Sequence, residues 1–315
     1  MVASQENKDL NCEESERFKL LNEYLDFLGN HRGLKKTTIS VRGHDVGKFL
    51  KSLKLQNDQV DIRGISVSQV YDYVIKTAKP MKRPTRKRFV SSIRSFLKFA
   101  HLRGYIQRDI TEAVPTVETP KLGSIPRGIS WESVENLLAV AGANLGSHTG
   151  RRSFAILQLL ATYGVRIGQV ATLLLQDINW REGSIQFRPV KFGNPLSFPL
   201  YPEVADALLT YIRETRGTAS YPEVFLTVCG EPVPLSNGGS LQTSMKTCFR
   251  HAGITTKSAH AIRHAFATRL MEQDTPIKTI ADLLGHKSIR NTFIYTKVDL
   301  KHLRLLTYEW PEVVS

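Results

Sequence analysis

Residues 111–128 divide the chain into two parts that are expected to fold separately. This segment, TEAVPTVETPKLGSIPRG, contains three prolines and two glycines and has no apolar period. Proline interrupts helices and strands and glycine favours turns, so the segment is predicted to be a linker. A chain of 315 residues is also longer than one typical domain core. We therefore expect two domains.

Four regions follow from this division. Residues 1–16 are polar and acidic and are predicted to be a loose tail. We expect an N-terminal domain over residues 17–113, a linker over 114–128 and a second domain over 129–315. No apolar run approaches the roughly 20 residues of a membrane span. The N-terminus also lacks the apolar core of a signal peptide, so a cytoplasmic protein is expected.

The N-terminal domain is expected to contain four helices. In the first, Phe18, Leu21, Leu25 and Leu28 recur at spacings of three and four and predict one apolar face. The third is expected over residues 66–76. The fourth lies within residues 81–108 and buries a stripe formed by Phe89, Ile93, Phe96, Leu97 and Ala100.

The fourth helix is also strongly basic. Residues 81–108 contain nine lysines and arginines and no acidic residue, in a chain of net charge +14. A solvated helix face normally mixes both signs, whereas a face of one sign suits contacts with phosphates, so the partner is predicted to be nucleic acid. The candidate DNA contacts are Lys82, Arg83, Arg86, Lys87, Arg94 and Lys98.

The second domain is predicted to be mostly helical around a small antiparallel sheet. Ser130 is a candidate N-cap for a helix over 131–140, and further helices are expected over 153–163 and 167–176. Residues 184–189 and 196–200 are predicted to be two strands joined by a turn. Helices are expected again over 202–213 and from about residue 239. The whole chain is thus mainly α with a small antiparallel β-sheet.

A histidine and an arginine share a helical face near the C-terminal end. His260 and Arg263 are three residues apart, a spacing that places both side chains on one side of a helix. An arginine fork and an imidazole together suit a phosphate. His260 and His264 also have a zinc-pair spacing. However, the sequence HAIRH lacks the glutamate of HExxH, Arg263 would repel a cation, and no CxxC pair is present, so we expect no metal.

Four other residues carry weaker signals. Arg166 lies at a turn among apolar neighbours, which predicts partial burial and a need for a partner. Lys191 lies at the expected hairpin tip and His286 follows a glycine. Tyr295 follows nine residues later, and by itself such a tyrosine is more often packed than reactive.

Five motifs in order resemble those of the tyrosine recombinase, or phage integrase, family. They are Tyr163-Gly-Val-Arg-Ile-Gly, Lys191-Phe-Gly-Asn with Phe198-Pro-Leu, His260-Ala-Ile-Arg-His-Ala-Phe-Ala-Thr, Leu283-Leu-Gly-His-Lys-Ser and Thr292-Phe-Ile-Tyr. The resemblance covers roughly residues 17–300. It implies a two-domain DNA clamp with an N-terminal four-helix core-binding domain and a C-terminal catalytic domain.

The resemblance also implies roles for these residues in site-specific DNA recombination. Tyr295 is the nucleophile and forms a 3′-phosphotyrosyl link. Arg166 and Arg263 stabilise the phosphate, His260 assists proton removal, Lys191 protonates the departing 5′ oxygen and His286 hydrogen-bonds the phosphate. Two rounds of exchange would form and resolve a Holliday junction. Covalent catalysis conserves the phosphodiester energy, so no cofactor is expected.

Two positions are assigned only supporting roles. The family usually has Glu or Asp three residues after the first arginine, where this chain has Gln169. That departure puts the orientation of Arg166 in doubt. His264 is the second histidine of its motif, and a purely structural role remains open. Leu300, Leu303 and Leu306 predict a tail helix, which in the family docks on a neighbouring subunit and so implies a homotetramer on DNA.

Two other functions fit the same catalytic set. A type IB topoisomerase would relax DNA without a defined site, and a catalytically silent regulator would only bind DNA. The tail favours recombination, and no catalytic residue is missing. Because about 16 residues precede the first helix, we expect a simple recombinase of the Xer or Cre kind. The sequence leaves the DNA site and any accessory proteins open.

Overall fold

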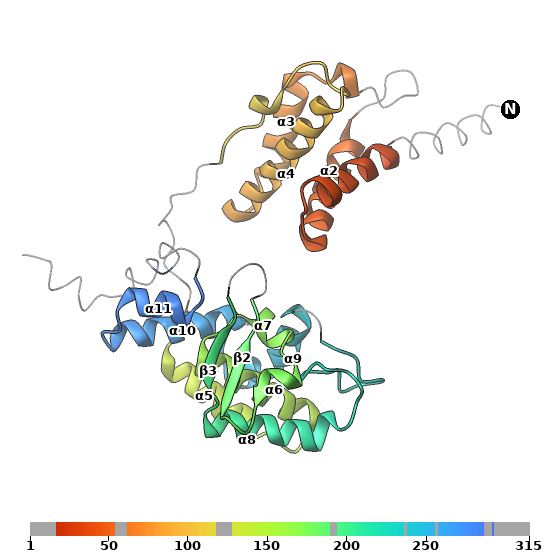
Figure 1. The fold of residues 1–315 in the computed structure, drawn as a ribbon. Coiled ribbons are helices and arrows are strands. Elements are labelled where there is room, and N and C mark those ends of the chain that lie inside the picture. Colours follow the sequence, from red (N-terminus) through yellow and green to blue (C-terminus); the bar gives the residue numbers. More distant parts are fainter. Residues whose placement is uncertain are drawn as a thin grey trace, which may run out of the picture. The chain divides into compact units, whose positions relative to one another are not determined.

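The computed structural model describes residues 17–53, 62–117, 128–189, 194–235, 238–255, 258–286 and 292. The chain forms two compact units, residues 1–123 and 124–315 (Figure 1). Within the described ranges the first unit is helical, and the second is helical around one three-stranded antiparallel sheet. This confirms the predicted fold class. None of the helices described in either unit is long and apolar enough to cross a membrane.

Four helices make up the described part of the first unit. Residues 17–26 are helical and continue into a π-helical turn, η1 (Phe27–His31). The other three are α2 (Lys36–Ser52), α3 (Val67–Ala78) and α4 (Arg83–Leu102). Two 3-10 turns, η2 (Ile62–Gly64) and η3 (Thr111–Ala113), lie between α2 and α3 and after α4. α3 begins at its N-cap Ser66, whose hydroxyl accepts from the backbone N–H of Gln69.

The core of the first unit is built on α4. Its predicted apolar stripe, residues Phe89, Ile93, Phe96, Leu97 and Ala100, is buried throughout, which confirms that prediction. The ring of Tyr24 packs edge-on against Phe96, with centroids 5.4 Å apart. Aromatic pairs in this arrangement stabilise a core beyond the area they bury.

The first helix packs most of its predicted face against the core, with Phe18 as the exception. Phe18 was expected in the apolar stripe, but its side chain is 65% exposed. The buried positions are Leu20, Tyr24 and Leu28, four residues apart, while Leu21 and Leu25 flank them. The prediction for Phe18 is therefore wrong, whereas Leu21, Leu25 and Leu28 pack against the core as expected.

The second unit contains seven helices in its described part, and the sheet packs one face against the core while alternate side chains of β2 (Ser184–Phe187) and β3 (Leu196–Pro199) are exposed. The helices are α5 (Trp131–Gly142), α6 (His148–Tyr163), α7 (Ile167–Ala171), α8 (Pro202–Tyr211), α9 (Gly238–His251), α10 (Ala259–Glu272) and α11 (Ile277–Leu283). A π-helical turn, η5 (Ile212–Arg216), extends α8, and a 3-10 turn, η4 (Leu175–Asp177), precedes the sheet. Ser130 caps α5 through its hydroxyl, which confirms that prediction.

The sheet has the order β1-β2-β3 and is antiparallel throughout. Its strands are β1 (Ile178–Asn179), β2 (Ser184–Phe187) and β3 (Leu196–Pro199), and Ile185 of β2 lies opposite Phe198 of β3. The two predicted strands are therefore present and paired, while residues 190–193 of the turn lie outside the described residues. β1 was not predicted, because a strand of two residues is too short to show an alternating pattern.

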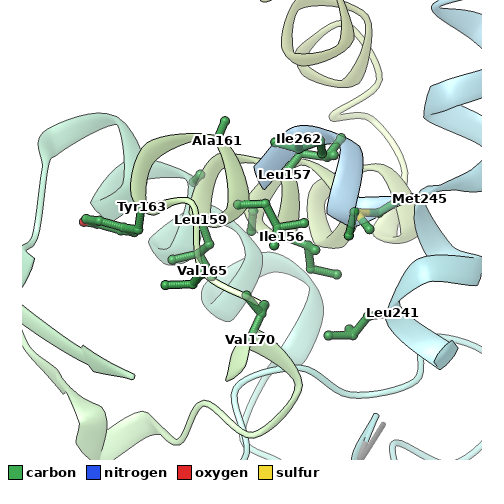
Figure 2. Close-up of a cluster of buried hydrophobic side chains, with 14 of the residues drawn as sticks. Ile156, Leu157, Leu159, Ala161, Tyr163, Val165, Val170, Leu241, Met245 and Ile262 are labelled. Carbon is green, nitrogen blue, oxygen red and sulfur yellow. The ribbon is translucent and has the colours of Figure 1, made fainter. Parts of the chain in front are cut away.

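α6 forms the centre of the second core. Ile156, Leu157 and Leu159 project from different sides of this helix and are fully buried (Figure 2). Side chains of α7, α9 and α10, including Val170, Met245 and Ile262, surround them. Apolar side chains buried on several sides of one helix are typical of the middle of a core, and only positions 151, 154, 158 and 162 of α6 are partly exposed from residue 150 onward. The C-terminal end of α6 is thereby held in place, and the candidate site begins directly after it.

Candidate active site

Arg166 lies at the N-terminus of α7, directly after the turn that ends α6. α6 ends at Gly164, whose backbone φ is 58°, and the following Val165 is buried. Arg166 is partly exposed, as its apolar neighbours predicted. Its guanidinium donates to the carbonyl oxygens of Leu284 and Gly285, each at 3.4 Å. The turn after α6 therefore directs this cation toward the C-terminal end of α11.

Arg263 lies on α10 and is only 4% exposed. Its Nη1 donates to the carbonyl oxygen of Gly164 at 2.8 Å, and its Nη2 donates to that of Leu284 at 2.7 Å. A guanidinium that donates to acceptors from both of its arms has little freedom to rotate. Arg263 thus presents a fixed fork beside the turn that carries Arg166.

The two arginines meet at the turn that follows α11. Both guanidinium groups donate to the carbonyl oxygen of Leu284, although Arg166 and Arg263 are 97 positions apart in sequence (263 − 166). The packing of α10 against α11, through Ala267, Met271, Ile280 and Leu284, holds this turn in place. Two guanidinium groups on one turn create a site that favours an anion with several oxygens, such as a phosphate.

His286 completes the group from the same turn. Its Nε2 lies 2.9 Å from Nη2 of Arg263, and its Nδ1 lies 2.8 Å from Oγ1 of Thr292. Desolvation, together with the positive charges of Arg263 and Arg166, lowers the pKa of His286 to about 4. The imidazole is therefore neutral at pH 7.

His260 and His264 extend this group along α10. Partial desolvation and the charges of Arg263 and Arg166 lower the pKa of His260 below its usual value, although the residue as a whole is exposed. Desolvation, His260 and Arg263 lower the pKa of His264 as well. A neutral, accessible imidazole at His260 is able to accept a proton from an incoming hydroxyl. The predicted shared face of His260 and Arg263 is consistent with this arrangement.

Gln169 supports the first turn of α7. Its side chain is buried, and its Oε1 accepts from the backbone N–H of Arg166 at 3.0 Å. The first N–H groups of a helix lack partners within the helix, so this contact satisfies one of them. An uncharged side chain thus fixes the backbone from which Arg166 projects.

Two of the predicted catalytic residues lie outside the described residues. These are Lys191, in the predicted hairpin turn, and Tyr295, the predicted nucleophile. The predicted tail helix, with Leu300, Leu303 and Leu306, lies outside them too. Their roles stay predictions from the sequence.

Two residues of the site were given no role from the sequence. Gly164 supplies a carbonyl oxygen to Arg263, and Thr292, which is fully buried, pairs with His286. Both lie inside the motifs quoted above, Gly164 two residues before Arg166 and Thr292 three residues before Tyr295. Neither side chain carries charge, so only their place within a motif could have drawn attention to them.

The predicted DNA contacts on α4 and at its start fall into two groups. Lys82, Arg83, Lys87 and Lys98 are exposed. In contrast, Arg86 donates to the carbonyl oxygens of Ala78 and Lys79, and Arg94 donates to that of Val114 at 2.7 Å. The second group therefore stabilises the first unit itself. Within the parts of the chain described here, no cluster of His, Cys, Asp or Glu is arranged to hold a metal ion.

Two family models match the chain. The model described as "Phage integrase family" matches residues 129–302, and "Phage integrase, N-terminal SAM-like domain" matches residues 21–104. The chain is 32% identical over 294 residues to the putative integrase/recombinase y4rA of Sinorhizobium fredii, covering 91% of this chain and 70% of that protein. It is 29% identical to tyrosine recombinase XerD of Staphylococcus saprophyticus, over 92% of this chain and 98% of that protein.

Solved structures share the fold at low identity. A lambda integrase fragment, determined as a dimer bound to a COC′ core site, has a TM-score of 0.68 and 16% identity, covering 94% of this chain and 99% of that one. The XerH site-specific recombinase bound to difH substrate has a TM-score of 0.64 and 15% identity, and the match covers 87% of this chain and 79% of that one. These likenesses extend the agreement in sequence to the architecture of both units.

Proposed function

The chain belongs to the phage integrase family of tyrosine recombinases, and from this premise we propose that it recombines DNA at a specific site through Tyr295. The observation that carries this proposal is the convergence of Arg166, Arg263 and His286 on one turn. Two guanidinium groups and a neutral imidazole are thereby brought to one turn, an arrangement that suits the binding of a phosphate. The relatives named above are recombinases and integrases, which favours recombination over DNA relaxation or binding alone.

The proposed reaction is a transesterification at one DNA phosphate. The phenol oxygen of Tyr295 attacks phosphorus, forms the 3′-phosphotyrosyl bond and breaks the bond to the 5′ oxygen. His260 takes the phenol proton and Lys191 gives a proton to the departing 5′ oxygen. Arg166 and Arg263 stabilise the charge that develops on the nonbridging oxygens. The 5′-hydroxyl of a partner strand then attacks phosphorus and releases Tyr295.

His260 suits this role because its pKa is lowered. A neutral imidazole accepts a proton, whereas an imidazolium does not. The unperturbed pKa of a tyrosine is about 10, so the phenol is protonated at pH 7 and needs an acceptor. The charges of Arg263 and Arg166, which lower the pKa of His260, also favour the phenolate that forms.

The larger assembly follows from the chemistry of strand exchange. We propose a homotetramer on two DNA sites, joined by exchange of the C-terminal tail, that forms and resolves a Holliday junction. A lambda integrase structure is of a tetramer bound to a Holliday junction, which supports this arrangement. Residues 17–113 are proposed to bind the core site, 114–128 to link, and 129–315 to catalyse. Because the proposed substrate is DNA, we propose that the enzyme acts at the nucleoid in the cytoplasm.

A nicked suicide duplex tests the nucleophile. The duplex carries the recognition site, found beforehand by selecting bound duplexes from random-sequence DNA, and a nick that lets the cleaved end diffuse away. The wild-type protein should form a covalent adduct that survives a denaturing gel. Tyr295→Phe should abolish the adduct and keep noncovalent binding, while Tyr221→Phe, at an exposed tyrosine, should behave as wild type. An adduct that persists in Tyr295→Phe would refute the assignment.

A further inference from the structure

Thr292 and Arg263 contact the two nitrogens of the same imidazole. Nδ1 of His286 lies 2.8 Å from the hydroxyl oxygen of Thr292, and Nε2 lies 2.9 Å from Nη2 of Arg263. We propose that Thr292 is a positioning residue that fixes His286 as the Nδ1–H tautomer, so that the imidazole holds the Arg263 fork in place. This inference rests on the proposed recombinase function. In the DNA-free protein it makes Nε2 of His286 an acceptor for Arg263, in place of the phosphate hydrogen bond that the family resemblance implied.

The tautomer follows from the chemistry of the partners. A guanidinium nitrogen only donates hydrogen bonds, so Nε2 of His286 must offer its lone pair to Arg263. The proton of a neutral imidazole is then on Nδ1, and the hydroxyl of Thr292 accepts it. The low pKa of His286 supports the neutral form at pH 7. Without an acceptor at Thr292, the ring could place its proton on Nε2 and lose Arg263.

Burial makes the hydroxyl of Thr292 hard to replace. Thr292 has no exposed surface, so a water molecule cannot take over its contact to Nδ1 of His286. Nη2 of Arg263 also donates to the carbonyl oxygen of Leu284. His286 and Leu284 thus orient one arm of the fork together, and Gly164 orients the other.

Two substitutions separate the hydroxyl of Thr292 from its packing. Thr292→Val keeps the shape and loses the acceptor, whereas Thr292→Ser keeps the acceptor and loses a methyl group. We expect single-turnover cleavage of the suicide duplex to fall about tenfold or more in Thr292→Val and to stay within about threefold in Thr292→Ser. The affinity for DNA should be the same in both. The opposite order of rates would assign Thr292 to packing and overturn the proposal.

A matched threonine–histidine pair provides the control. The hydroxyl of Thr215 lies 3.3 Å from Nδ1 of His148 on the surface of the same unit. Thr215→Val removes a contact of the same kind at a distance from the site, and cleavage should stay at the wild-type rate. A loss equal to that of Thr292→Val would show a general effect of losing a hydroxyl and would count against the proposal.

Nitrogen-15 NMR of the imidazole reads the tautomer without any catalysis. The DNA-free wild-type protein should show His286, identified as the signal lost in His286→Gln, with its proton on Nδ1. Thr292→Val should shift this signal toward the Nε2–H form, and Thr292→Ser should not. A wild-type signal with the proton on Nε2 would overturn the inference even if Tyr295 forms the adduct. An adduct that persists in Tyr295→Phe would instead refute the proposed nucleophile and leave the tautomer result intact.

Discussion

Oε1 of Gln169 accepts a hydrogen bond from the backbone N–H of Arg166 at 3.0 Å, so an uncharged side chain anchors the first residue of the site. The family pattern described above has Glu or Asp at this position, where this chain has Gln169. The structure gives the amide oxygen the contact that a carboxylate oxygen would make at a helix N-terminus. The departure therefore removes a charge but keeps the acceptor.

Gln169→Ala should weaken both the fold and the reaction. The substitution leaves the N–H of Arg166 without its acceptor and opens space in a buried position. We expect the free energy of unfolding to fall by about 1–2 kcal/mol. Cleavage should slow about tenfold as Arg166 loses its fixed backbone. Chemical denaturation and single-turnover cleavage measure the two effects, and Gln169→Glu, which restores an acceptor, should stay close to wild type in both.

Gln69 offers a matched control in the first unit. Its Oε1 accepts from the backbone N–H of Ser66 at 2.8 Å, the same contact at the start of α3. Gln69→Ala should lower the free energy of unfolding, because the N–H of Ser66 loses its acceptor, and it should leave the cleavage of prebound DNA unchanged. If Gln169→Ala also leaves cleavage unchanged, Gln169 serves the fold alone.

Acid should destabilise the protein partly through His286. In the folded state its pKa is about 4 because of desolvation and the charges of Arg263 and Arg166. In the unfolded chain it returns to about 6.5. Between these two pKa values the unfolded state binds a proton that the folded state does not. The contribution of His286 to the free energy of unfolding is therefore complete above about pH 6.5 and is lost as the pH falls toward 4.

His286→Gln removes this contribution and should flatten the pH dependence. The midpoint of thermal unfolding, measured from pH 7.5 to 4.5, should fall less steeply than in wild type, with each 1 kcal/mol corresponding to about 2–4 °C. His260 and His264, whose pKa values are also lowered, keep part of the slope in the variant. His148→Gln, at an exposed histidine, serves as the control. Parallel curves for wild type and His286→Gln would contradict the assignment.

Local patterns in the sequence predicted local structure well. The stripe of α4 from Phe89 to Ala100 is buried because an apolar period of 3.6 residues leaves a helix only one face to bury. The shared face of His260 and Arg263 follows from their spacing in the same way. The family motifs then selected Arg166 and His286 from among many similar residues.

Tertiary contacts explain what the sequence could not predict. Arg166 reaches Gly285, which is 119 residues away, only because α10 and α11 pack together. Arg94 carries the same charge as its neighbour Lys98 on α4, yet it donates to the carbonyl oxygen of Val114. No spacing rule distinguishes these two cations. The difference depends on the path of the chain after α4, which brings Val114 next to Arg94, and this path is set by the packing of the whole first unit.

The contrast between Lys98 and Arg94 predicts two different phenotypes. Lys98→Ala should weaken DNA binding and lower the slope of log affinity against log salt by about 0.9, because one phosphate contact is lost, with unfolding unchanged. Arg94→Ala should lower the free energy of unfolding by about 1–3 kcal/mol, because the carbonyl of Val114 loses a charged donor. Salt titrations of binding and chemical denaturation separate the two. Equal salt slopes in wild type and Lys98→Ala would exclude Lys98 from the DNA contacts.

The turn at Gly164 should tolerate no side chain. Its φ of 58° strains any other residue, and a Cβ there would lie 2.3 Å from Cδ1 of Phe266. Gly183 has a φ of 60° with open space around it, so Gly183→Ala measures the strain alone, about 1 kcal/mol. Gly164→Ala should cost about 1–3 kcal/mol more in the free energy of unfolding, because the clash adds to the strain.

The same substitution should also slow DNA cleavage, because the carbonyl oxygen of Gly164 accepts from Arg263. A shift of this turn moves Arg166 and Arg263 together. Phe266→Ala in the Gly164→Ala background removes the clash but keeps the strain. The double variant should therefore lose less stability than the sum of the two single variants, and part of the cleavage rate should return. Additive losses, with no recovery of cleavage, would show that Phe266 does not fix the position of this turn.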